Sequence, residues 1–142
     1  MLITVAGEKT KYGKWKGIAY MGKSKEGQIL FKGCQSLTTQ DTTMAKLIAI
    51  REATQKAIHF GFRKLIILVR DKDIVRIWSN THQARWQLTP ILVDLKPLKQ
   101  QYGLYVHIQS AHPLILTELN TMARKASNSF VNVFQVSPPL TL

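Results

Sequence analysis

"TTMAKLIAIREATQKAIHFGFRKLIILVRDKDIV" (residues 42–75) contains a helical repeat, an apolar run and an acidic turn in succession. Within residues 43–60 the apolar side chains recur with helical spacing, and Leu47, Ile50 and Ala57 fall on one side. The run at 63–69 is almost continuously apolar, which is typical of a strand buried on both faces. Asp71 follows at the strand end, the position where ligands bind in open α/β sheets. Asp71 is therefore a candidate site residue.

Three short apolar segments separated by polar turns precede this unit, and further helical and strand patterns follow it. The expected elements are strands at 1–7, 15–22, 27–37 and 104–110, and helices at 71–80, 90–102 and 114–128. Hairpin-linked strands followed by β–α units predict a mixed sheet with helices on its faces. The last segment, 131–142, alternates in part before Pro138 and Pro139. It is expected to be an edge strand, a partner-binding arm or a flexible arm.

The composition is that of one folded domain. The chain has 142 residues, of which 45% are hydrophobic, enough for a full core. No apolar run reaches the roughly 18 residues of a membrane span, so we expect no membrane partner. Cys34 is the single cysteine, which excludes an internal disulfide and favours a reducing, intracellular compartment, cytoplasm or nucleus.

The chain has an excess of positive charge, and many of its lysines lie near its start. Twenty Lys and Arg face eight Asp and Glu, a net charge of +12, which favours an acidic polymer as partner. Lys9, Lys11, Lys14 and Lys16 surround Trp15. Such a patch can stack a base and hold phosphates. Alternatively, Trp15 belongs to the core and the lysines form an ordinary solvated surface.

Six segments, taken in order, resemble a type I ribonuclease H domain, and in particular its reverse-transcriptase-like branch from retroelements and plants. They are "TVAGE", "GKWKGIAYM", residues 42–75, "WQLTPILVDLKPL", "VHIQS" and "LNTMARKA". The resemblance implies an α/β ribonuclease H-like fold with a five-stranded mixed sheet of order 3-2-1-4-5, flanked by helices. It also implies a domain spanning 1–130, followed by a tail at 131–142.

The same resemblance identifies four positions where the family carries metal-binding carboxylates. Family members use these acids to hold two Mg²⁺ ions about 4 Å apart for RNA hydrolysis. In this chain the four positions are Ala6, Lys46, Asp71 and Asn120, so one carboxylate of four is kept. On this basis the chain is expected to bind no metal or other cofactor and to be no enzyme, a ribonuclease H-like domain with a degenerate site.

Lys46 has two interpretations. Its ammonium either pairs with Asp71 and fills the space of a metal, or extends into solvent. In both cases a cation at this position opposes binding of a dication and suits a phosphate.

We therefore expect a domain that binds double-stranded RNA or an RNA–DNA hybrid through a basic surface comprising Lys9, Lys11, Lys14, Trp15, Lys16 and Lys46. An alternative is a protein-interaction, tethering or homodimerisation module within a larger retroelement-derived or viral protein. A third hypothesis is an active nuclease with a rebuilt site.

Overall fold

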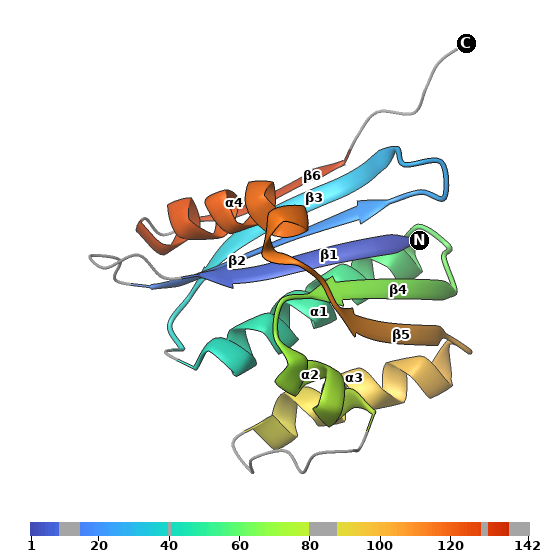
Figure 1. The fold of residues 1–142 in the computed structure, drawn as a ribbon. Helices are drawn as coiled ribbons and strands as arrows, with labels where there is room; N and C mark the ends of the chain where they lie inside the picture. The colour runs from blue at the N-terminus through green and yellow to red at the C-terminus, as the bar shows by residue number, and fades with distance from the viewer. Residues whose placement is uncertain (9–14, 40, 80–87, 129–130, 137–142) are drawn as a thin grey trace.

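A computed structural model describes residues 1–8, 15–39, 41–79, 88–128 and 131–136 of the chain (Figure 1). Six strands form a single sheet, and its strand order is β5-β4-β1-β2-β3-β6. The strands are β1 (Leu2–Glu8), β2 (Lys16–Lys23), β3 (Ile29–Leu37), β4 (Lys64–Val69), β5 (Tyr105–Ser110) and β6 (Asn132–Val136). The pairs β1–β2, β2–β3 and β3–β6 are antiparallel, whereas β4 lies parallel to both β1 and β5.

The sheet contains the expected order 3-2-1-4-5 but has one strand more than predicted. The additional strand is β6, which pairs with β3 so that Val133 lies opposite Cys34. The buried Ser36 side chain fastens the start of this segment: its hydroxyl donates to the Ala126 carbonyl (2.6 Å) and accepts from the Val131 amide (3.0 Å). The count of five strands came from the resemblance, and of the alternatives expected for the tail the structure shows the edge strand, over Asn132–Val136.

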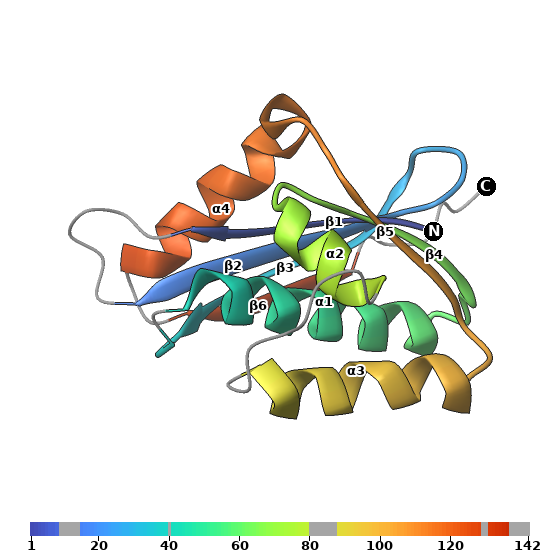
Figure 2. The ribbon, with the colours of Figure 1, turned by 60° about the horizontal axis from the view of Figure 1, so that its bottom comes forward.

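The helices cover the two faces of the sheet unequally. They are α1 (Thr42–His59), α2 (Lys72–Trp78), α3 (Thr89–Gln101) and α4 (Thr117–Asn128). Figure 2 shows α1 and α3 together on one face and α4 on the opposite face. The last helix was expected from residue 114, but Pro113–Leu116 form a 3₁₀ turn and the α-helix begins at Thr117.

The N-terminus of α1 is capped as its sequence suggests. The Asp41 carboxylate accepts hydrogen bonds from the amides of Thr43 (3.0 Å) and Met44 (3.2 Å), two donors that have no partner within the helix. This cap sets where α1 begins, and therefore which of its side chains lie beside the end of β1.

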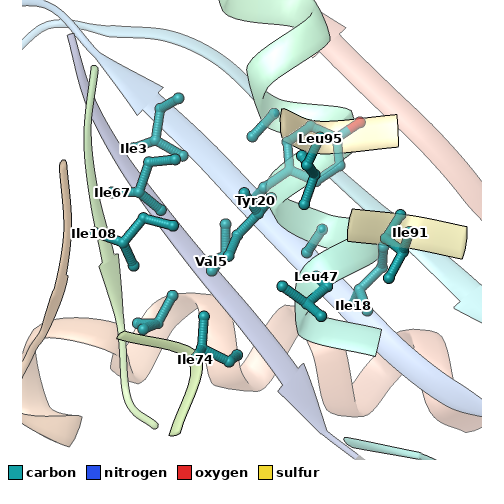
Figure 3. Close-up of a cluster of buried hydrophobic side chains, with 14 of the residues drawn as sticks. Ile3, Val5, Ile18, Tyr20, Leu47, Ile67, Ile74, Ile91, Leu95 and Ile108 are labelled. Carbon is teal, nitrogen blue, oxygen red and sulfur yellow. The ribbon is translucent and has the colours of Figure 1, made fainter. Parts of the chain in front are cut away.

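The core has two parts, one on each face of the sheet. Figure 3 shows the larger part, where side chains of β1, β2, β4 and β5 pack against α1, α2 and α3. The smaller part lies under α4 and includes Ala6, Ala19 and Ala123. Here α4 approaches β2 so closely that a Cβ on Gly17 would lie 1.8 Å from the Ala123 carbonyl oxygen. Among the described residues no helix has both the length and the apolar composition needed to cross a membrane.

Candidate functional site at the ends of β1 and β4

An ion pair between Lys46 and Asp71 lies at the centre of the candidate site. Asp71 stands between the end of β4 and the first residue of α2, and Lys46 lies one turn inside α1. The Lys46 ammonium is 2.8 Å from the Asp71 carboxylate, and it donates a hydrogen bond to Oδ2. The Lys46 side chain is 7% exposed and the Asp71 side chain 32% exposed. The pair therefore joins a nearly buried cation to a carboxylate that reaches solvent.

The space for the Lys46 side chain is provided by Gly7 on β1. A Cβ built on Gly7 would lie 3.1 Å from Lys46 Cγ, a tighter contact than side chains normally make. The absence of a side chain at residue 7 thus allows the aliphatic stem of Lys46 to lie against the backbone of β1. Gly7 was not among the site residues identified from the sequence.

Ala6 and Asn120 belong to the other face of the sheet. Ala6 is part of the small apolar cluster beneath α4, and Asn120 is a buried polar residue of α4 itself. Of the four positions singled out from the sequence, the structure brings Lys46 and Asp71 into contact. Neither Ala6 nor Asn120 supplies a charged group to this pair.

These residues do not fit the two-Mg²⁺ site that the fold implies. Mg²⁺ takes oxygen ligands, often carboxylates. At the four positions there is one carboxylate, at Asp71, and it already accepts a hydrogen bond from an ammonium. Ala6 offers no side-chain oxygen and Asn120 offers a neutral amide.

Exposed basic residues stand next to the acidic member of the pair in the sequence. Arg70 and Lys72 flank Asp71 in the sequence and are both exposed. Asp73, further along, has a loose contact with Arg76 at 3.7 Å, and both of these side chains are mostly exposed. Arg70 and Lys72 were missed by sequence reasoning, although their position on either side of the candidate Asp71 was a usable signal.

The predicted basic patch near the chain start is described only in part. Lys9, Lys11 and Lys14 lie outside the described residues. Trp15 is half-buried, and its backbone amide donates to the Ser127 carbonyl. The Lys16 side chain is buried rather than freely solvated, and its ammonium donates to the Thr42 hydroxyl (2.9 Å) at the start of α1.

Solved structures with a similar fold include ribonuclease H1 proteins and a viral reverse transcriptase. The ribonuclease H1 of Halobacterium salinarum NRC-1 matches with a TM-score of 0.77 at 14% identity, over 88% of this chain and 95% of that one. LC11-RNase H1, solved in complex with an RNA/DNA hybrid, matches with a TM-score of 0.80 at 13% identity, over 89% and 95% of the two chains. A foamy viral protease-reverse transcriptase, also solved with an RNA/DNA hybrid, matches at 0.59 and 13% identity, over 89% of this chain and 19% of that one. The fold is thus ribonuclease H-like.

The sequence itself places the chain within this fold class more narrowly. Residues 8–130 match the model of the reverse transcriptase-like family, and the chain belongs to that family. No curated protein matches the sequence.

These comparisons correct one expectation. The chain was predicted to be no enzyme because three of four carboxylate positions are replaced. However, it shares its fold over most of its length with ribonuclease H1 enzymes. The replacements at Ala6, Lys46 and Asn120 are therefore no evidence of inactivity. The error lay in taking the residues at four positions as sufficient to decide whether the chain is an enzyme.

Proposed function

We propose that this domain binds a nucleic-acid duplex containing an RNA strand, and that exposed Arg70 and Lys72, which flank Asp71 in the sequence, form a basic rim at the contact surface. The observation that carries the proposal is the ammonium of Lys46, held 2.8 Å from the Asp71 carboxylate at the strand ends. It neutralises the carboxylate that would otherwise repel phosphate.

Charge around the pair supports this assignment. Because Lys46 pairs with Asp71 and Asp73 pairs with Arg76, the exposed Arg70 and Lys72 add positive charge to this segment. The whole chain has a charge of +12, which attracts a polyanion from any direction. Lysine and arginine contacts to phosphates supply affinity that does not depend on base sequence.

The RNA–DNA hybrid and double-stranded RNA are the first ligands to test. Two solved structures with this fold contain an RNA/DNA hybrid, which makes the hybrid a reasonable first choice. The hybrid and double-stranded RNA share an A-like geometry with a wide, shallow minor groove. A surface that binds one of these duplexes is therefore expected to bind the other.

The test compares labelled hybrid, double-stranded RNA and double-stranded DNA of equal length at two salt concentrations. We expect the duplexes that contain RNA to bind more tightly than duplex DNA, and binding to weaken as salt increases. The double variant Arg70→Ala/Lys72→Ala should reduce the slope of log K against log salt by up to about 2, since each phosphate contact on a duplex contributes about 0.9.

The matched control is Lys32→Ala/Lys125→Ala, which removes the same charge from a cavity between β3, β6 and α4. If both double variants lose the same affinity, the rim is not the contact surface and only the overall charge matters. Equal affinity for the three duplexes would reject the preference for RNA.

A further inference from the structure

Exposed aromatic rings gather beside cations at the end of the domain where α1 and α3 finish. Phe60 follows α1, Tyr102 follows α3 and Phe134 lies on β6, and these rings are 37%, 39% and 39% exposed. The Lys56 ammonium lies 4.7 Å from the centre of the Phe134 ring. The Arg63 guanidinium lies 5.8 Å from the centre of the Tyr102 ring. Cations near the ring faces are favourable electrostatically, and they place positive charge beside Phe134 and Tyr102.

Buried Phe31 holds two of these rings in position. Its ring is stacked on Phe60, with centroids 5.7 Å apart and an interplanar angle of 19°. Phe134 lies against it on another side, at 6.1 Å. Because Phe31 is itself 0% exposed, it supports Phe60 and Phe134 from within the fold. The rings are thus held by packing before any ligand arrives.

Two cavities connect these rings into one surface. The larger, of about 750 Å³, is lined by Gln55, Lys56, His59, Phe60, Phe134 and Val136. The smaller, of about 290 Å³, is lined by Gln55, Ile58, His59, Leu98 and Tyr102. They share Gln55 and His59, so the surface runs without interruption from β6 across the end of α1 to the end of α3. We call it the aromatic end surface.

The charge of the aromatic end surface indicates the chemistry of its ligand. Lys56 and His59 line it, and no acidic residue is among the described residues that line either cavity. A ligand with flat apolar groups linked by negative charge is complementary to such a surface. Single-stranded nucleic acid has this pattern, since its bases stack on aromatic side chains while its phosphates approach cations.

We infer that the aromatic end surface binds single-stranded nucleic acid, with bases stacked on Phe60, Phe134 and Tyr102 and phosphates near Lys56 and His59. This surface is separate from the duplex contact proposed above. Lys46 and His59 are thirteen residues apart on the straight helix α1, which corresponds to roughly 20 Å. One domain would therefore hold a duplex at one end of α1 and a single strand at the other.

The test measures binding of fluorescein-labelled oligo(dT) and oligo(U) to the whole domain by anisotropy. We expect Phe134→Leu/Tyr102→Leu to weaken both complexes roughly tenfold or more, because each stacked base contributes substantially to affinity. The single variant Phe134→Trp should bind both oligonucleotides about as tightly as the parent does, since an indole ring also stacks on bases. If residue 134 were needed only for folding, tryptophan at this position would not preserve binding. The far-ultraviolet circular dichroism and the duplex affinity of Phe134→Leu/Tyr102→Leu should be the same as those of the parent.

Tyr105→Leu is the matched control. Tyr105 is an exposed tyrosine on β5 with the Lys64 ammonium 5.7 Å from its ring, but it lines neither cavity. The inference is overturned if Tyr105→Leu weakens binding as much as Tyr102→Leu, or if Phe134→Leu/Tyr102→Leu leaves single-strand affinity intact. It is also overturned if the parent forms a concentration-dependent dimer in analytical ultracentrifugation, and Phe134→Leu/Tyr102→Leu abolishes this dimer but leaves oligonucleotide binding unchanged. In that case a second copy of the chain covers the surface. Failure of the duplex proposal would appear in a separate measurement, the duplex affinity of Arg70→Ala/Lys72→Ala.

Discussion

Replacing Asp71 by alanine leaves the nearly buried ammonium of Lys46 without its partner. The Lys46 side chain is 7% exposed and its ammonium lies 2.8 Å from Asp71, so little water can replace the lost carboxylate. Removing one partner of a buried ion pair costs about 3–5 kcal/mol. Because 32% of the Asp71 side chain reaches solvent, which screens the pair, we expect the lower end, about 3 kcal/mol. Asp71 also occupies the N-cap position of α2 but makes no side-chain cap hydrogen bond, so capping does not add to the loss.

Replacing Lys46 by methionine should cost less. Methionine retains a flexible apolar chain against Gly7, and the orphaned Asp71 carboxylate can still be hydrated. We expect a loss of about 1 kcal/mol, and a similar loss in the double variant Lys46→Met/Asp71→Ala, which leaves no unpaired charge. The double variant should therefore be more stable than Asp71→Ala alone, and the coupling free energy should be about 2–3 kcal/mol.

The assay is equilibrium unfolding in urea, followed by circular dichroism, for the parent, both single variants and the double variant. A parallel cycle on Asp73 and Arg76 provides the control, because this pair is 3.7 Å apart, three residues apart on one helix and more than half exposed. Its coupling should stay below about 1 kcal/mol. Additive losses at Lys46 and Asp71, or a coupling no larger than that of the control pair, would refute the argument that burial makes this ion pair strong.

Two further predictions concern the packing around the sheet. Gly7→Ala should destabilise the domain by about 1–3 kcal/mol in a thermal melt, because its Cβ would lie 3.1 Å from Lys46 Cγ. The loss should largely disappear in a Lys46→Ala background; if it does not, Lys46 is not the cause. Burial, helped by the nearby Glu52 carboxylate and Cys34, raises the pKa of Tyr20 from 10.0 to about 12. The folded protein then holds the phenol proton more tightly than the unfolded chain does, so stability present below pH 10 should fall between pH 10 and 12, by about 1.4 kcal/mol per unit at most. Tyr20→Phe should abolish that decline in urea melts at pH 9 and 11, and a decline that persists would assign it to another group.

Local patterns in the sequence were sufficient for the order of elements, whereas the one contact predicted in the site depended on the family resemblance. The helical repeat and the apolar run within residues 42–75 correspond to α1 and β4, because amphipathic spacing and continuous hydrophobicity are properties of neighbouring residues. The pairing of Lys46 with Asp71 was one of two interpretations of Lys46, and it depended on the resemblance to ribonuclease H, which brings the start of the first helix beside the end of the fourth strand. The structure confirms the pairing, at 2.8 Å.

Only the tertiary structure shows the features that form where distant segments of the chain come into contact. Gly7 leaves space for Lys46 because α1 lies against the end of β1, and the sequence carries no sign of that close approach. The sixth strand pairs with β3, and Ser36 of β3 accepts a hydrogen bond from the amide of Val131, which is far away in the chain. Phe60, Tyr102 and Phe134 come from three separate segments, so their periodicities could not show that they form one surface. The physical reason is that sequence periodicity records which side of an element is apolar, whereas a binding surface or a steric gap depends on which elements are brought together and how closely they pack.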